Sequence, residues 1–117
     1  MAPWLRLSAV GFLLLFALSA FSQAPAPPAN LTVHAGLYGG AELHWDSTTG
    51  AVAYRIYKSI DDSPFGRVAE VFHREFFDWY VYPGHAYHYY VTAGNRDGES
   101  DPSDTIGFRF EIGRAHV

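Results

Sequence analysis

The sequence contains no cysteine, and this absence excludes several kinds of chemistry. Disulfide bonds, thiolate nucleophiles and zinc sites built on cysteine all need a thiol. A lipid anchor on a processed N-terminal cysteine needs one as well. Any domain that the chain forms must therefore be held together by its core, without covalent cross-links.

Positive charge is also scarce. The chain has 8 Lys and Arg residues against 12 Asp and Glu residues, which gives a formal net charge of −4. No run of basic side chains occurs anywhere in it. Proteins that bind nucleic acid follow its phosphates with a basic surface, so we expect no nucleic acid partner.

The longest apolar run is too short to cross a bilayer as a helix. It extends from Leu7 to Phe21, about 15 residues, whereas a spanning helix needs roughly 20. One basic side chain, Arg6, precedes this run, and small side chains follow it. This order is typical of a secretory signal peptide. We therefore predict a secreted or cell-envelope protein; an uncleaved membrane anchor is the alternative.

Small side chains at positions −3 and −1 predict cleavage of this peptide after Ser22. Cleavage after Ala24 would also fit, but Pro25 would then follow the cut, where its fixed φ and missing N–H should hinder the peptidase. We therefore assign residues 1–22 to a signal peptide and expect no stable membrane anchor after its removal. An exported chain without disulfides is more typical of bacteria than of a small animal domain.

The segment QAPAPPA, residues 23–29, is rich in proline. Proline fixes φ and donates no backbone hydrogen bond, so this segment is unsuited to a helix or a central strand. We predict an extended linker of polyproline II type, which provides distance between its two ends.

The rest of the chain is rich in apolar side chains: 49% of all residues are hydrophobic and 17% are aromatic, enough for the core of one domain. From Leu31 onward, apolar and polar residues alternate in short stretches between turn signals, and no stretch has helical spacing. Seven such stretches predict an all-β fold, a seven-stranded immunoglobulin-like β-sandwich over residues 30–110. The side chains expected to point inward include Ala41, Leu43, Trp45, Val52, Tyr54, Ile56, Tyr87, Tyr89 and Val91.

Three stretches, LHW, YRIYKS and VYPGHAYHYYVTAGNRDGESDPS, resemble the fibronectin type III family, in particular its secreted bacterial members. The resemblance covers nearly the whole chain after the signal peptide. It implies a tyrosine corner formed by Val81 and Tyr87, in which the phenol hydroxyl bonds to upstream backbone. It also matches Asp78 to an Asp that bacterial members often carry before the corner. The expected structural core is Leu43, Trp45, Tyr54, Ile56, Val81, Tyr87, Tyr89 and Val91.

Six histidines raise the question of a metal site. His85 and His88 are three residues apart, and on a strand this spacing places them on opposite faces. His44 belongs to the second strand, which in the expected sandwich lies in the other sheet. Because metal ligands must converge from one face, we predict no metal site and no cofactor.

The sequence has no recognisable catalytic motif. No serine lies in a G-x-S-x-G elbow. The pair Asp61 and Asp62 sits in a polar loop, where turn capping is a better explanation than acid–base chemistry. The glycine-rich stretch AGLYGGAE precedes a strand instead of a helix, so it predicts a hairpin and not a phosphate loop. We therefore predict no catalytic residues and no enzymatic activity.

Aromatic side chains on the outside of the sandwich are the remaining candidates for function. The third, sixth and seventh strands should share a sheet whose outward residues include Thr92 and either Phe108 or Phe110. Trp79, Tyr80 and Tyr82 lie near the Pro-Gly corner, and one or two of them must be exposed. Such a surface could pack against a neighbouring domain, bind an extracellular protein or stack on polysaccharide. The candidate interaction residues are Arg55, Tyr57, His88, Tyr90 and Trp79.

Residues 111–117, EIGRAHV, end without a turn or a cap. One back-translation of Ile112 to Val117 resembles a widely used sequencing adapter, so we interpret this segment as a non-native or truncated tail. The chain would then be the N-terminal part of a longer protein. The sequence as a whole predicts a non-catalytic secreted module that acts as a spacer or a protein-interaction domain. The alternatives are a carbohydrate-binding module that uses exposed aromatics and an ancillary domain of a truncated exported hydrolase.

Overall fold

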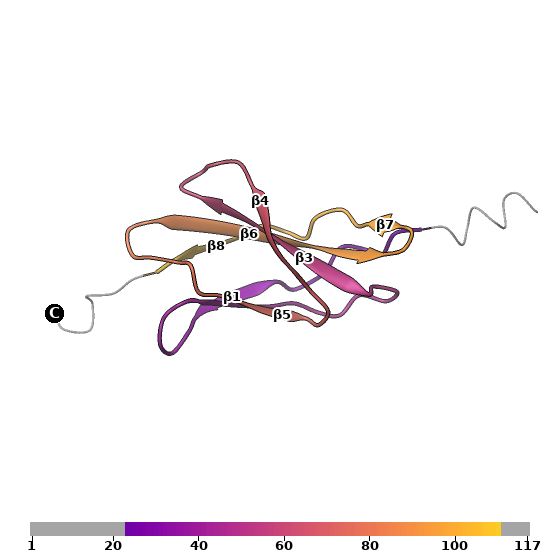
Figure 1. The fold of residues 1–117 in the computed structure, drawn as a ribbon, viewed down its shortest axis with the longest axis horizontal. Helices are drawn as coiled ribbons and strands as arrows, with labels where there is room; N and C mark the ends of the chain where they lie inside the picture. Colours follow the sequence, from indigo (N-terminus) through magenta and orange to yellow (C-terminus); the bar gives the residue numbers. More distant parts are fainter. Residues whose placement is uncertain (1–22, 111–117) are drawn as a thin grey trace, which may run out of the picture.

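Two antiparallel β-sheets form the protein in the computed structural model, which describes residues 23–110 (Figure 1). Within these residues no helix is long and apolar enough to cross a membrane. The predicted signal peptide, residues 1–22, and the predicted tail, residues 111–117, lie outside the described part of the chain. The expected all-β sandwich is confirmed.

The two sheets differ in size. The smaller sheet has three strands in the order β1-β2-β5, and the larger one has the order β4-β3-β6-β7, with β8 also paired to β6. The strands of the smaller sheet are β1 (Thr32–Ala35), β2 (Ala41–His44) and β5 (Glu75–Asp78). Those of the larger sheet are β3 (Ala53–Ile60), β4 (Gly66–Val71), β6 (Ala86–Asn95), β7 (Gly98–Glu99) and β8 (Ile106–Arg109).

The last strand of the expected seven is divided into β7 and β8, and both parts pair with β6. Pro102 lies between them and has no backbone N–H to donate to the ladder. Two serine side chains compensate: the hydroxyl of Ser100 accepts from the N–H of Ala93, and that of Ser103 accepts from the N–H of Val91, each at 2.9 Å. The sandwich therefore keeps its connectivity, although the final strand is interrupted.

The core lies between the two sheets. All eight side chains that the sequence places there are buried, and Trp45 packs edge-on against Tyr54 with ring centroids 5.5 Å apart. The tyrosine corner is also present, since the backbone N–H of Tyr82 donates to the hydroxyl of Tyr87 at 2.7 Å. The eight residues are Leu43, Trp45, Tyr54, Ile56, Val81, Tyr87, Tyr89 and Val91.

Two expected orientations and one expected exposure are wrong. Val52 is 67% exposed because β3 begins one residue later and Val52 lies in the preceding bend. Thr92 points outward as expected but is buried, because Glu99, which accepts a hydrogen bond from its hydroxyl, lies over it. Phe108 packs against the core, since its register partner on β6 is the buried Tyr87 and paired residues share a face.

The proline-rich segment packs along the sandwich over part of its length. Pro28 is buried, and the carbonyl of Ala29 accepts from the backbone N–H of Asp46 at 2.9 Å. Further toward the N-terminus, the amide side chain of Asn95 donates to the carbonyl of Gln23 at 3.3 Å. The segment is thus attached beside the end of β6 and does more than separate two ends.

Candidate interaction surfaces

Four of the five candidate residues come together on the outer face of the larger sheet, where Tyr57 pairs with Tyr90 in the β3–β6 register. The two phenol rings are stacked, with centroids 4.7 Å apart and planes 16° from parallel. Phe65, from the loop before β4, adds a third ring at 4.8 Å from Tyr90. We define the outer face by these three residues together with Arg55, His88, Thr92 and Glu99.

The polar groups of the outer face bind mostly to one another. Glu99 accepts hydrogen bonds from the hydroxyl of Tyr57 at 2.6 Å and from that of Thr92, and it lies 3.3 Å from Nη1 of Arg55. The bond from Thr92, followed by that from Tyr57, holds the pKa of Glu99 below its ordinary value of 4.5. Burial raises the pKa of Tyr57, and its bond to Glu99 adds to this effect. These contacts give polar partners to Arg55, Tyr57, Thr92 and Glu99.

Trp79 lies elsewhere, immediately after β5 of the smaller sheet. Its side chain is 60% exposed and meets the ring of Phe77 edge-on, with centroids 4.2 Å apart. The candidate residues therefore do not form one surface: four share the outer face of the larger sheet, and Trp79 belongs to a different region.

That region is one end of the sandwich. Ala41 at the start of β2 pairs with Asp78 at the end of β5, and Ala86 at the start of β6 pairs with Arg109. The β1–β2 hairpin, the segment after β5 and the end of β8 therefore meet at the same end (Figure 1). The large exposed hydrophobic side chains here, which we call the end surface, are Leu37, Tyr38, Trp79, Tyr80 and Tyr82.

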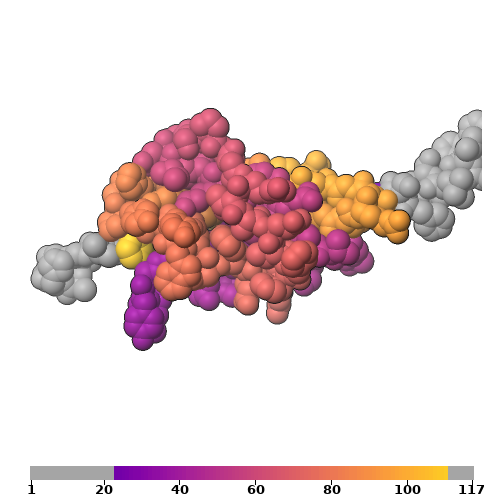
Figure 2. All heavy atoms as spheres, in the orientation of Figure 1, coloured from indigo at the N-terminus to yellow at the C-terminus, as the bar shows by residue number. Residues whose placement is uncertain are grey.

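Glycines allow the hairpin to approach the aromatic ring beneath it. A Cβ at Gly36 would lie 2.6 Å from the ring of Phe77, and one at Gly40, whose φ is +83°, would lie 2.8 Å from it. Leu37 and Tyr38 occupy the turn between these glycines and are each 88% exposed. Figure 2 shows this hairpin projecting from the body of the molecule at the lower left.

A buried charged group supports the end surface from inside. The Lys58 ammonium lies 2.7 Å from the carboxylate of Asp78, and their side chains are only 6% and 5% exposed. Asp78 also accepts from the hydroxyl of Tyr89 at 2.6 Å and from the backbone N–H of Tyr80 at 3.0 Å. Lys58 in turn donates to the carbonyl of Tyr80 at 2.7 Å. Burial is the main cause that raises the pKa of Tyr89 far above its usual range.

This group joins the two sheets and fixes the backbone that carries Trp79 and Tyr80. Its charges are shielded from solvent, so it is suited to holding structure and not to reacting with a substrate. The sequence argument noted Asp78 but missed Lys58. The signal was present, because Lys58 follows Tyr54 and Ile56 at intervals of two and must share their inward face.

Two titratable loop residues, Asp61 and His85, are partners of each other. Nδ1 of His85 lies 2.6 Å from the carboxylate of Asp61, which also accepts from the backbone N–H of Ala86 at 2.9 Å. The bond to His85 is the largest cause that lowers the pKa of Asp61. Asp61 thus caps the start of β6. Among residues 23–110 no group of three or more histidine and carboxylate side chains is placed to hold a metal ion.

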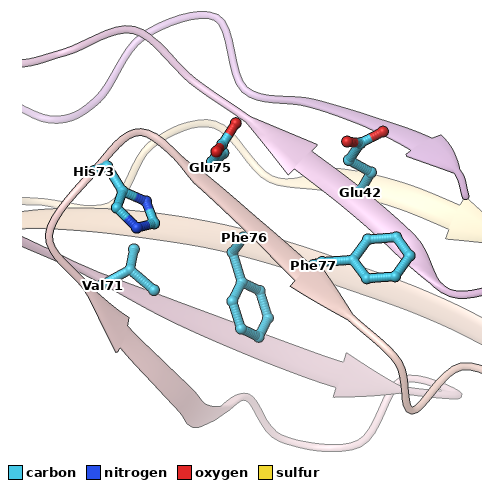
Figure 3. A pocket seen from close by; sticks show the side chains of 6 residues that line it. All are labelled: Glu42, Val71, His73, Glu75, Phe76 and Phe77. Carbon is cyan, nitrogen blue, oxygen red and sulfur yellow. The ribbon is translucent and has the colours of Figure 1, made fainter.

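A shallow cavity of about 290 Å³ lies beside β5 (Figure 3). Phe76 points from β5 toward Val71 on β4, whereas Glu75 points the opposite way. A second cavity, of about 300 Å³, adjoins it at Phe76 and Phe77 and extends toward Trp79. The first is lined by Glu42, Val71, His73, Glu75, Phe76 and Phe77.

Sequence comparison alone places the chain in no group: no protein-family model matches it, and no curated protein is significantly similar. Solved structures, in contrast, share its fold. A structure described as an FN3tt mutant has a TM-score of 0.67 and 26% identity, covering 74% of this chain and 97% of that one. An Fn3-like protein from Clostridium thermocellum has a TM-score of 0.66 and 25% identity, covering 79% of this chain and 100% of that one. The twitchin kinase region from C. elegans has a TM-score of 0.68 at 18% identity, covering 80% of this chain and 19% of that one, and shows similarity of fold alone.

Proposed function

Because residues 23–110 have the fold of a fibronectin type III domain, we propose that the protein is a non-catalytic module of an exported protein whose end surface packs against a neighbouring protein domain. The end surface is the observation that carries this proposal. Five large exposed apolar side chains belong to the hairpin and the loop that meet at the same end of the sandwich as Arg109. A cluster of this kind exceeds the scattered apolar residues of an ordinary protein surface.

The chemistry of the end surface suits contact with protein. Tyrosine and tryptophan combine a large apolar area with a polar group and are enriched at the centres of protein interfaces. Trp79 and Tyr80 are also held in place, because both polar backbone groups of Tyr80 bond to the buried pair of Lys58 and Asp78. A rigid apolar surface loses little conformational entropy on binding, which favours affinity.

The positions of the two ends of the described segment, residues 23–110, support a spacer role as well. Gln23 lies beside Asn95 at one end of β6, and Arg109 lies beside Ala86 at the other. Domains joined through such opposite ends extend in a line instead of folding back. The titratable groups described above favour a non-catalytic role, since they are occupied in buried pairs or in loop caps.

The proposal is tested with a single fluorescent reporter. In Trp45→Phe, Trp79 is the one tryptophan left after removal of the predicted signal peptide. We expect its emission to shift to shorter wavelength and its quenching by iodide to fall when residues 23–110 are compared with the longest natural form of the protein. Tyr90→Ser on the outer face is the matched control and should leave this change intact, whereas Tyr38→Ser should reduce it.

Two results would contradict the proposal. Equal emission and quenching in the short and long forms would remove the neighbouring domain as the occupant. A shift that is induced instead by polysaccharides, in a panel of common glycans, would assign the exposed aromatics to sugar binding.

A further inference from the structure

β5 has a free edge. The strand pairs with β2 on one side, and no other strand within residues 23–110 pairs with it. An edge strand presents unpaired N–H and C=O groups that can serve as a template for another chain. Many proteins protect such an edge by covering it or by interrupting it with a β-bulge.

The hydrogen-bond pattern shows which groups face outward. The carbonyl of Arg74 accepts from the backbone N–H of Trp45 at 3.1 Å, so Arg74 faces β2. In an antiparallel ladder, successive residues turn their backbone groups to alternate sides. The N–H and C=O groups of Glu75 and Phe77 therefore point away from β2, toward the free edge.

The edge of the larger sheet on this side is different. β4 is its outermost strand, and its pairing with β3 is irregular between Ile56 and Tyr57, where Val68 is left without a partner. A bulge of this kind twists a strand and makes its edge a poor template. β5 has no such irregularity in its register with β2, so its edge remains regular.

The two sides of the β5 edge differ in chemistry. On the inner side, Phe76 and Val71 line the adjoining cavities and Val68 is about half exposed, which makes this side apolar. On the outer side, Glu75 and Glu42 are both acidic. His44 lies 3.7 Å and 3.5 Å from their respective carboxylates, and His34 pairs with Glu42 in the β1–β2 register. Within residues 23–110 neither carboxylate has a lysine or arginine partner.

We propose that β5 pairs with an extended segment of another polypeptide in which apolar side chains alternate with lysine or arginine. Residues that pair across a ladder share a face. The partner residue opposite Phe76 would enter the apolar cavity, and the residues on either side of it would lie opposite Glu75 and Phe77. A long cationic side chain could then pair with Glu75, and one opposite Phe77 could extend across that ring toward Glu42 on β2. This binding goes beyond the packing of the end surface and does not depend on it.

The same charges argue against a second copy of this chain as the occupant. If two β5 strands paired about Phe76, both copies would bring Glu75 and Glu42 to the same outer face. Each Glu75 would then lie opposite Phe77 of the other copy, so the two Glu75 carboxylates would be diagonal neighbours in adjacent strands and neither would gain a cationic partner. A segment with lysine or arginine at these positions would instead bring positive charge to the carboxylates.

The test uses the mature chain and a peptide probe, Ac-Thr-Lys-Val-Lys-Val-Lys-Thr-NH2. We expect saturable binding that slows hydrogen exchange of the Glu75 and Phe77 amides, measured by NMR. Two control peptides isolate the causes. Replacement of each Lys by Glu should abolish detectable binding, and N-methylation of alternate peptide nitrogens should do the same by blocking the ladder.

Two variants at position 75 separate the contribution of the backbone hydrogen bond from that of the side-chain charge. Glu75→Pro removes a donor on the free edge, where proline is tolerated in sheets, and should weaken binding of the lysine peptide about tenfold. Glu75→Gln keeps the donor and should weaken it about threefold, as expected for an exposed ion pair. Thermal unfolding shows whether each variant is folded; if Glu75→Pro is not, the N-methylated peptides carry the test.

The proposal is overturned if the lysine peptide does not bind, if the glutamate peptide binds equally well, or if the affected amides lie elsewhere. Concentration-dependent protection of Glu75 and Phe77 without any peptide would identify a second copy as the occupant and would overturn it as well. None of these results alters the proposal for the end surface, which is tested by the emission of Trp79.

Discussion

The outer face of the larger sheet and the end surface are both rich in aromatic side chains, but they differ in what those side chains already contact. Tyr57 and Tyr90 stack on each other, and the hydroxyl of Tyr57 is bonded to Glu99. Leu37 and Tyr38 are almost fully exposed at a hairpin tip. Outward orientation on a strand therefore does not by itself mark a binding surface.

The difference has a physical origin. Side chains on a flat sheet have cross-strand neighbours at about 5 Å, so aromatic and charged residues there stabilise one another. Leu37 and Tyr38 at the hairpin tip have no such neighbours and are left in water, whereas Trp79 contacts Phe77 on one side and is still 60% exposed. This difference favours a structural role for the outer face and supports the interaction role proposed for the end surface.

The largest expected effect concerns the buried pair that supports the end surface. Asp78→Asn leaves the Lys58 ammonium buried without a counter-charge and should lower the free energy of unfolding by about 3 to 5 kcal/mol. Urea denaturation measures this loss. Asp101→Asn, at an exposed loop position, is the control and should change little. A loss below about 1 kcal/mol for Asp78→Asn would mean that solvent reaches the pair.

A substitution in the outer face should have the second largest effect on the free energy of unfolding. Tyr90→Ser removes a ring that stacks on Tyr57 and contacts Phe65, and should lower the free energy of unfolding by about 1 to 2 kcal/mol. A double-mutant cycle with Tyr57→Ser measures the contribution of the stack itself. Independent effects of the two substitutions would show that the rings do not stabilise each other, and the contrast with the end surface would weaken.

Glu99→Gln tests the polar part of the outer face. The lowered pKa of Glu99 means that its carboxylate is stabilised on folding. The free energy of unfolding of the wild type should therefore be about 1 kcal/mol higher than that of the variant at neutral pH. This advantage is present above the ordinary pKa and is lost as pH falls through the lowered one. Urea denaturation at several acidic pH values checks the direction. A difference that grows with acidification would contradict the contacts described for Glu99.

The smallest effect is expected at the hairpin tip. Leu37→Ser combined with Tyr38→Ser should change the free energy of unfolding by no more than about 0.5 kcal/mol, since both side chains are exposed. The same pair should abolish the response of Trp79 to the neighbouring domain. A large loss of stability here would show that the tip is part of the folded core.

Much of the fold could be predicted from residue alternation. The alternation with a period of two predicted the buried strand residues Tyr54 and Ile56 correctly. If it had been continued by two residues, it would have placed Lys58 with them on the inner face. The predicted inward orientation of Val52 was wrong, because alternation alone does not show where a strand begins. The resemblance around the Pro-Gly corner also gave the bond from Tyr87 to the upstream backbone.

The candidate sites were harder to predict because they depend on contacts between distant segments. The cover of Thr92 by Glu99 requires the turn between β6 and β7 to fold back. The separation of Trp79 from Tyr57 and Tyr90 follows from the assignment of β5 to the other sheet. Leu37 and Tyr38 were passed over, because a glycine-rich stretch indicates a turn and says nothing of what the turn exposes.

Hydroxyl-radical footprinting of the aromatic rings tests the central contrast most directly. Oxidation rates are compared between residues 23–110 and the longest natural form of the protein. The account predicts that Tyr38 and Trp79 become protected in the long form, while Tyr57 and Tyr90 react at the same rate in both. Protection of Tyr57 and Tyr90, with Tyr38 and Trp79 unchanged, would contradict it and return the interaction role to the outer face.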